Sequence, residues 1–171
     1  HLVGEHNVYN LLSAIGVAHH EGATPDQVRE AVGQVTNVPG RFERVMAGQA
    51  FTVVVDYAHT EDALVRLLTA AEAMKTGRLI TVFGCGGDRD RTKRPLMGAV
   101  AGRLSDLIII TSDNPRSEDP ARIIEEIQRG ITPDTRRDAA QRILTIVDRR
   151  KAIRTAIELA GPGDVILLAG K

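Results

Sequence analysis

The sequence has no tryptophan, and aromatic residues make up only 3% of its 171 residues. Leucine, isoleucine, valine and alanine must therefore fill the core, and a hydrophobic content of 43% is ordinary for a globular protein. The single cysteine, Cys85, excludes an internal disulfide and fits a reducing cytoplasm. No apolar run approaches the roughly 20 residues that a membrane helix needs, so we expect no membrane partner.

A surplus of charge of either sign is also absent. Lys and Arg together number 22, and so do Asp and Glu, which gives a formal net charge of zero. A general nucleic-acid-binding protein normally carries a basic surplus, so this balance argues against a nucleic-acid partner. The length fits one α/β domain, or one domain with a fragment of another, and we interpret the protein as cytoplasmic.

The two ends of the chain suggest a fragment of a longer protein. The sequence begins without methionine at a helix-like segment, and it stops where a strand-like run meets Gly170 and Lys171. Apolar residues at helical spacing predict a first helix over residues 6–20. Pro25 opens a second helix with Thr24 as its N-cap. The residues of this helix that we expect to face inward are Val28, Ala31 and Val32.

A linker-like stretch, Asn37-Val38-Pro39-Gly40, separates these helices from the rest of the chain, so we predict two parts, residues 1–37 and 38–171. After this stretch strands and helices alternate. The predicted strands are 42–46, 51–55, 79–83, 107–110, 143–147 and 165–168, and the predicted helices are 60–74, 95–104, 120–129 and 149–160. The first two strands could form a hairpin. The alternation predicts an α/β fold with a mostly parallel sheet and helices on both faces.

The unusual residues fall directly after predicted strands. In open parallel sheets, ligands bind beyond the carboxyl ends of the strands. Four segments take such positions: Asp56-Tyr57-Ala58-His59, Gly84 to Arg91, Thr111 to Arg116, and Ala169-Gly170-Lys171. We therefore expect these four strand ends to meet at one edge of the sheet.

The glycine-rich segment does not match a known nucleotide motif. Gly84 and Gly86 give GxG, but Arg89 stands where a dinucleotide fingerprint needs its third glycine. The segment also lacks the Gly-Lys-Ser/Thr of a phosphate-binding loop. A flexible turn remains an alternative, and the charged run GGDRDRTKRP is most often a solvated loop. Its position directly after a buried strand weakens the solvated-loop interpretation and keeps a binding role open.

Asp113-Asn114-Pro115-Arg116 could hold an amino-acid zwitterion. Asp113 would receive the ammonium group, Arg116 would fork onto the carboxylate, and Asn114 would supply both a donor and an acceptor. Pro115 would fix the backbone. The alternative is a capped turn before the helix at residue 120, where Asp and Asn are common. The residues alone leave the two interpretations equal.

The remaining candidates support no catalytic role. His59 has no second histidine or glutamate at metal-ligand spacing, so we predict no metal site. Cys85 has no adjacent general base, and we interpret it as a small residue in a tight turn. We assign no catalytic residue to the chain.

Taken in order, six strings resemble the Mur ligase family. They are HNVYNLLSAI, PGRFERV, VVVDYAHTEDAL, VFGCGGDRDRTKRPLMG, TSDNPRSEDP and LLAGK. The resemblance covers essentially the whole chain. It implies a Rossmann-like C-terminal domain preceded by a helical remnant of the central ATPase domain. In the family, DNPR marks the members that select meso-diaminopimelate, whereas lysine-adding members carry another residue where Arg116 stands.

The resemblance also implies a reaction. ATP would phosphorylate the D-glutamate carboxylate of UDP-N-acetylmuramoyl-L-alanyl-D-glutamate, and the amine of meso-diaminopimelate would attack the acyl phosphate, with magnesium ions (Mg2+) screening the phosphoryl group. The residues implied for meso-diaminopimelate are Arg89, Asp113, Asn114, Pro115, Arg116 and Gly170. Those implied for ATP are Asn7, Arg41, Asp56 and His59.

Several parts of the family pattern are missing from the sequence. There is no Gly-Lys-Thr phosphate loop, no magnesium-binding Glu or carbamylated Lys and no UDP-sugar domain, and the string GKGHE is cut after Lys171. We therefore expect the fragment alone to be inactive, with ATP and magnesium bound mainly by the missing central domain. The alternatives are a lysine-adding or other Mur-type amide ligase and a non-catalytic α/β module that binds a nucleotide or amino acid.

Overall fold

The computed structural model describes residues 5–35, 38–135 and 142–170. The chain forms two compact units, His1–Glu43 and Arg44–Lys171, and each is described by itself. The division that we predicted after residue 37 concerns the domains of a parent protein, and it stays a prediction. Within the described residues no helix is long and apolar enough to cross a bilayer.

The first unit contains a pair of helices. Helix α1 (Glu5–His20) ends before Gly22, which has φ +90°. Helix α2 (Pro25–Gln34) begins with a capping box in which Thr24 and Gln27 bond each other's backbone N–H groups. Three residues of α2 were predicted to face inward, and the prediction was wrong for Ala31, whose side chain is exposed. Only Val28 and Val32 are partly buried, because the partial cover on this helix reaches no further than these two residues.

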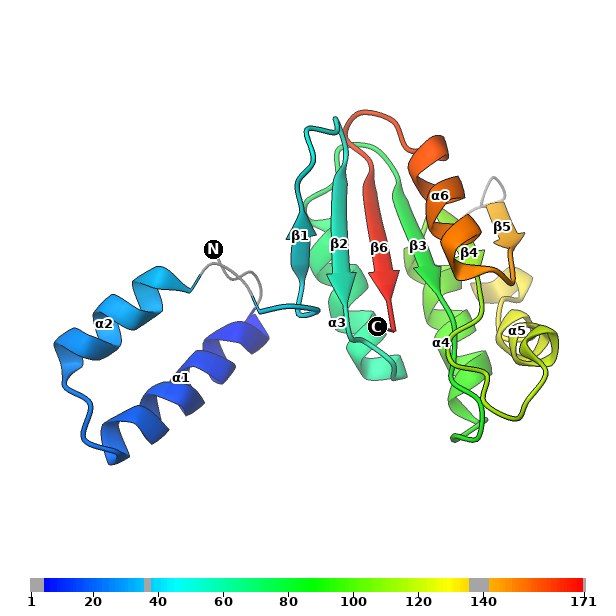
Figure 1. Cartoon of the computed structure of the whole chain (residues 1–171). Helices are drawn as coiled ribbons and strands as arrows, with labels where there is room; N and C mark the ends of the chain where they lie inside the picture. Colours follow the sequence, from blue (N-terminus) through cyan, green and yellow to red (C-terminus); the bar gives the residue numbers. More distant parts are fainter. Residues whose placement is uncertain (1–4, 36–37, 136–141, 171) are drawn as a thin grey trace. The chain divides into compact units, whose positions relative to one another are not determined.

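The second unit is built on a six-stranded sheet with the strand order β1-β2-β6-β3-β4-β5 (Figure 1). The strands are β1 (Glu43–Val45), β2 (Thr52–Asp56), β3 (Leu79–Phe83), β4 (Leu107–Ile110), β5 (Arg142–Thr145) and β6 (Val165–Ala169). Pairings from β2 to β5 are all parallel. The two strands predicted to form a hairpin, β1 and β2, are neighbours in the sheet. The predicted α/β class with a mostly parallel sheet is confirmed.

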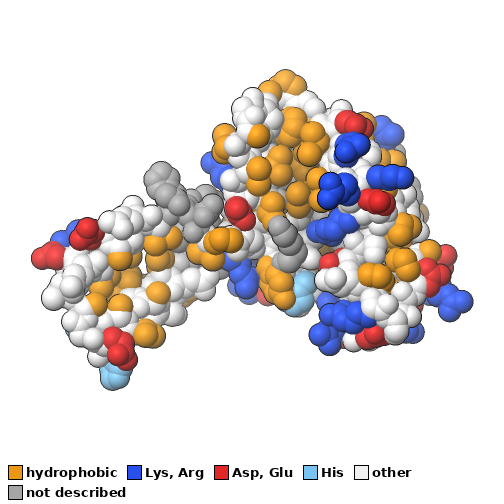
Figure 2. Space-filling view, in the orientation of Figure 1, with side chains coloured by type: hydrophobic (Ala, Val, Ile, Leu, Met, Phe, Trp, Pro, Cys, Tyr) orange, Lys and Arg blue, Asp and Glu red, His pale blue; other side chains and the backbone are white. Residues whose placement is uncertain are grey.

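Helices cover both faces of this sheet. Helices α3 (Glu61–Glu72), α4 (Lys93–Leu104) and α5 (Pro120–Gln128) pack in a row on one face, and the 3-10 turn η1 (Pro133–Thr135) follows them. Helix α6 (Arg149–Leu159) packs against β3, β4 and β6 on the other face. Figure 2 shows apolar side chains over the sheet beside α6 and basic side chains over α6 itself. The core under α6 comprises Val53, Ile80, Val82, Leu107, Ile109, Ala152, Ala156 and Ile166.

Two helices, α3 and α6, begin a few residues after strand ends, and a side chain caps each of them. Thr60 accepts a hydrogen bond from the backbone N–H of Ala63 at α3, and Asp148 accepts one from that of Lys151 at α6. Helix α4 begins at Lys93, two residues before the predicted start at Pro95. Proline fits there because the N–H groups of the first turn have no partner within the helix.

Candidate functional site

The strand register brings the predicted loops to one edge of the sheet. Phe83 is paired with Ile110, and Asp56 is paired with Ala169. The backbone N–H of Gly170 donates to the carbonyl oxygen of Asp56 at 3.1 Å. The segments that follow β2, β3, β4 and β6 therefore emerge side by side, as the strand pattern predicted.

Two of these segments lie directly on each other. We call residues 84–92 the glycine loop and residues 111–119 the DNPR loop. A Cβ added at Gly84 would overlap the carbonyl oxygen of Thr111, and one added at Gly87 would overlap that of Pro115. The backbone N–H of Gly87 donates to the carbonyl oxygen of Asn114 at 3.0 Å. Glycine is needed at both positions because the two backbones touch.

Two exposed arginines flank Gly86 at the rim of these loops. The Arg116 guanidinium donates to the carbonyl oxygen of Gly87 at 2.6 Å. A Cβ added at Gly86 would lie 3.0 Å from Nη1 of Arg116 and 3.8 Å from Cγ of Arg89. The guanidinium of Arg116 and the side-chain stem of Arg89 therefore lie on either side of Gly86. The family resemblance implied a binding role for both residues, but the sequence did not show that they lie together.

The DNPR loop holds a strained backbone. Asn114 has φ 39° and Arg116 has φ 51°, both in the left-handed region. Asparagine adopts this region more readily than most residues, but for arginine it costs on the order of 1–3 kcal/mol. Such a conformation persists only where surrounding contacts fix it, and strain of this kind is concentrated at functional sites.

Asp113 lies deeper, between the ends of β3 and β6. Its side chain is half-buried, and a Cβ added at Gly170 would lie 3.4 Å from its Oδ2. Gly170 has φ +84°, which favours glycine and lets the chain end of β6 pass close to the carboxylate. Within the described residues the Asp113 carboxylate accepts no hydrogen bond. Its negative charge acts on the guanidinium of Arg149 at the start of α6.

The capped-turn interpretation of the DNPR string is not what the structure contains. The N-cap of α5 is Asp119, whose Oδ1 accepts from the backbone N–H of Ala121 at 2.9 Å. Asp113 and Asn114 stand five or more residues ahead of that cap, so their side chains are not used to begin the helix.

The residues predicted to contact ATP divide between the two units. Asn7, which is 2% exposed on α1, and exposed Arg41 belong to the first unit. In the second, Oδ1 of Asp56 accepts from the backbone N–H of Ala58 at 2.7 Å. The exposed His59 ring packs edge-on against Tyr57, with ring centroids 4.8 Å apart. Their role with a nucleotide stays a prediction.

Sequence reasoning missed two arginines. Arg94 belongs to the charged run GGDRDRTKRP, for which a solvated loop is the usual structure, yet its side chain is 0% exposed and is bound by two carboxylates. Arg149, at the start of α6, donates from Nη2 to the carbonyl oxygen of Ala169 at 3.0 Å. Burial lowers the pKa of Arg149, and the charge of Asp113 opposes this shift. No local pattern in the sequence indicates this contact, because its acceptor is 20 residues away.

Neither a thiolate nor a metal cluster is found at this edge. Burial raises the pKa of the Cys85 thiol to about 11, and its Sγ lies 3.7 Å from Sδ of Met97. The thiol is therefore protonated at neutral pH and packs as a small apolar group. In the described part of the chain, no three His, Cys, Asp or Glu residues come together as metal ligands.

Comparison with known proteins agrees with the resemblance of the motifs. The family described as "Mur ligase, glutamate ligase domain" matches residues 40–171. The chain belongs to the Mur ligase family. A UDP-N-acetylmuramoyl-L-alanyl-D-glutamate--2,6-diaminopimelate ligase from Syntrophomonas wolfei is 52% identical over 170 residues, which are 99% of this chain and 34% of that protein. The chain thus spans about a third of the length of such Mur ligases.

Solved structures place the fold in the same group of enzymes. A structure of a ligase with that same name has a TM-score of 0.71 and 40% identity, and the match covers 99% of this chain and 34% of that one. The folylpolyglutamate synthase of Mycobacterium tuberculosis, solved with ADP and AMPPCP, has a TM-score of 0.74 at 25% identity, covering 99% and 38%. The expected Mur ligase C-terminal fold is confirmed.

Proposed function

We propose that the chain is the C-terminal part of an ATP-dependent ligase that adds meso-diaminopimelate to UDP-N-acetylmuramoyl-L-alanyl-D-glutamate in the cytoplasm. The observation that carries the proposal is the grouping of Arg116 and Arg89 around Gly86, with the Asp113 carboxylate beside Gly170 at the same end of the sheet. The relatives that are about 50% identical bear the name of this ligase.

The charges of this group fit the far end of meso-diaminopimelate. That end carries an ammonium group and a carboxylate, whereas the corresponding end of lysine carries only an ammonium group. In the proposal Asp113 accepts the ammonium group beside Gly170, and Arg116 and Arg89 take the carboxylate. Asn114 supplies a donor and an acceptor, and Pro115 shapes the backbone between them. A guanidinium can hold a carboxylate through two parallel hydrogen bonds, which gives geometric as well as electrostatic selection.

The nucleotide and magnesium belong mainly to other parts of the proposed parent protein. Arg41, Asp56 and His59 would contact ATP from the C-terminal side, and Asn7, in the remnant of the central domain, would lie near the adenine. Folylpolyglutamate synthase, a relative of the same fold, has been solved with ADP and AMPPCP. The residues present do not suit magnesium, because the described carboxylates form no cluster for a metal ion. We therefore assign no step of the reaction through the metal to this chain.

The full-length ligase provides the decisive test. Phosphate release and amide formation are measured with meso-diaminopimelate and with L-lysine. We expect a strong preference for meso-diaminopimelate in the wild type. Arg116→Ala should raise the KM for meso-diaminopimelate about 10- to 100-fold, because a charge-assisted hydrogen-bonded pair is lost. Arg103→Ala, an exposed arginine in the last turn of α4, is the matched control and should change nothing.

The isolated chain provides a second, simpler measurement. Calorimetric titration should show weak binding of meso-diaminopimelate and none of L-lysine, with the binding lost in Arg116→Ala. No turnover is expected from the chain by itself. An equal or greater activity of the full-length ligase with lysine would overturn the substrate assignment.

A further inference from the structure

The strained backbone of the DNPR loop must be fixed by its surroundings. Asp88 in the glycine loop, and Asn114 and Arg116 in the DNPR loop, all have positive φ, at 51°, 39° and 51°. None of them is a glycine, so their conformation needs contacts that hold it. Arg116 is the residue that the proposed function uses to select the amino acid. The contacts that fix its position therefore bear on specificity.

A buried guanidinium joins three segments beneath this loop. Arg94 is the second residue of α4, and its side chain is completely buried. It forks onto Glu118, with Nη2 to Oε1 at 2.8 Å and Nη1 to Oε2 at 3.0 Å. It also donates to Glu126 of α5 at 2.7 Å and to the carbonyl oxygen of Gly86 at 3.2 Å. One side chain thus fixes the glycine loop, the DNPR loop and α5 relative to one another.

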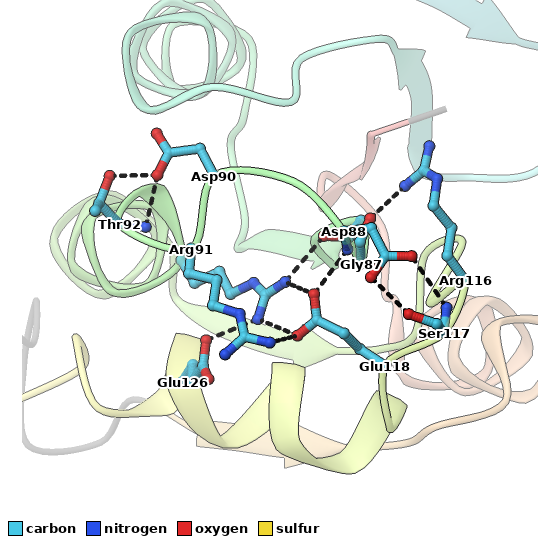
Figure 3. A network of polar contacts seen from close by, with 11 residues as sticks. Gly87, Asp88, Asp90, Arg91, Thr92, Arg116, Ser117, Glu118 and Glu126 are labelled. Carbon is cyan, nitrogen blue, oxygen red and sulfur yellow. Dashed lines mark hydrogen bonds and ion pairs between the residues drawn. The ribbon is translucent and has the colours of Figure 1, made fainter.

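Glu118 is the member of this group that lies closest in sequence to Arg116. Besides Arg94, it accepts from the backbone N–H of Asp88 at 2.7 Å and pairs with Arg91 at 2.9 Å (Figure 3). The hydrogen bonds from Arg94 are the main reason why the pKa of Glu118 falls to about 2. The carboxylate stays ionised at neutral pH, so its role is to hold geometry and not to carry a proton.

A second, exposed set of hydrogen bonds, which we call the exposed strap, joins Asp88 of the glycine loop to Ser117 of the DNPR loop. The Asp88 carboxylate accepts from the hydroxyl of Ser117 at 2.7 Å and from its backbone N–H at 3.2 Å. On the other side of Arg116, the N–H of Gly87 bonds the carbonyl oxygen of Asn114. Arg116 is therefore held through Ser117 on one side, through Asn114 two residues away on the other, and through its own guanidinium (Figure 3).

We propose that Arg94 and Glu118 are positioning residues that hold Arg116 in its binding conformation before the amino acid arrives, and so set the selectivity for a substrate with a second carboxylate. The inference rests on the proposed function. A preformed arginine loses little freedom when the ligand binds, which strengthens binding without a new contact. A loosened arginine would still carry its charge but would lose the alignment that a planar carboxylate requires.

The test uses the full-length ligase with Glu118→Gln. We expect the KM for meso-diaminopimelate to rise about tenfold, because a misplacement of this kind weakens every contact of Arg116. The KM for ATP and for the UDP-linked substrate should stay within about twofold. Glu125→Gln, the same change on an exposed residue of α5, is the control and should leave all three values unchanged.

A double-mutant cycle separates positioning from general support of the fold. If Glu118 acts through Arg116, Glu118→Gln should add nothing to the KM for meso-diaminopimelate once Arg116→Ala is present. Independent, multiplying effects would overturn the proposal, and so would an equal rise in the KM for ATP. Ser117→Ala, which cuts only the exposed strap and cannot disturb the core, should raise the KM for the amino acid by about twofold to threefold with no change in Tm. An unchanged KM in Glu118→Gln would also overturn it, whatever the result for Ser117→Ala.

The two proposals fail in different ways. Wild-type preference for L-lysine would overturn the proposed substrate, whereas the ratio between variant and wild type tests the positioning role on whichever amino acid the enzyme uses. Arg94→Lys gives a further check, because lysine keeps the charge but cannot fork onto Glu118. It should follow Glu118→Gln in its effect on the amino-acid KM.

Discussion

The carboxylate of Asp164 receives the backbone N–H of Arg78 at 2.6 Å and the guanidinium of the same arginine at 2.7 Å. This contact joins the turn before β6 to the turn before β3, at the amino ends of these strands. The candidate site lies at their carboxyl ends. Asp164 also accepts from the backbone N–H of Gly161 at 2.9 Å. Its side chain is only 5% exposed, so these donors replace the water that it has lost.

Asp164→Asn should lower the free energy of unfolding by about 1–3 kcal/mol, because the amide cannot accept at both of the former carboxylate oxygens. Urea unfolding followed by circular dichroism measures this change. The control is Asp62→Asn, which removes an ion pair with Arg66 whose two side chains are 74% and 67% exposed. Exposed pairs contribute little, so we expect less than about 1 kcal/mol there. Equal losses in the two variants would contradict the assigned role of Asp164.

The stability of the fold should fall as the solution becomes acidic. The pKa of Glu118 drops from 4.5 to about 2 on folding, and that of Asp164 is also lowered because the donors from Arg78 and Gly161 outweigh its burial. A carboxyl group with a lowered folded pKa stabilises the protein fully above its unfolded pKa, and this contribution is lost as the pH falls toward the folded value. We expect the loss to extend from about pH 4.5 down to about pH 2. Unfolding measured at pH 7 and pH 3 in wild type and Glu118→Gln checks this, since the variant should depend less on pH.

Gly87→Ala should separate the glycine loop from the DNPR loop. The added methyl group would overlap the carbonyl oxygen of Pro115, which is backbone and cannot turn aside. We expect a loss of about 1–3 kcal/mol in unfolding free energy together with loss of amino-acid binding. Gly161→Ala is a suitable control, because its new methyl group would come no closer than 4.0 Å to a described atom. Retained binding in Gly87→Ala would show that the close approach of the loops is dispensable.

Cys85 should resist alkylation in the native protein. Its pKa of about 11 leaves very little thiolate at pH 8, and the side chain is buried. Iodoacetamide labelling followed by mass spectrometry across a urea series should show modification only as the protein unfolds. Rapid labelling at pH 8 without urea would mean that the turn after β3 opens in the folded state.

Much of the sheet could be predicted because its strands are marked by local patterns. The buried strands 79–83 and 107–110 were expected with the same bounds that the structure has, since unbroken apolar runs are typical of strands covered on both faces. The N-cap at Thr24 could be predicted from the residue type and the proline that follows it. The grouping of loops at the carboxyl ends of the strands followed from the parallel strand pattern.

The buried network at the site could not be predicted, because its partners are distant in sequence. Arg94 binds carboxylates that are 24 and 32 residues away, at Glu118 and Glu126. A run of charges read locally is typical of a solvated surface, and nothing in its pattern indicates which member turns inward. The same limit applies to Arg149, whose acceptor at Ala169 lies 20 residues further on.

The position of β6 has a consequence for the order in which the protein can assemble. It is the last strand in sequence, yet it lies between β2 and β3 in the sheet. A chain that ends before β6 lacks the strand that joins β2 to β3, so the full sheet cannot form. We therefore expect the sheet of the second unit to close only after translation has passed Ala169.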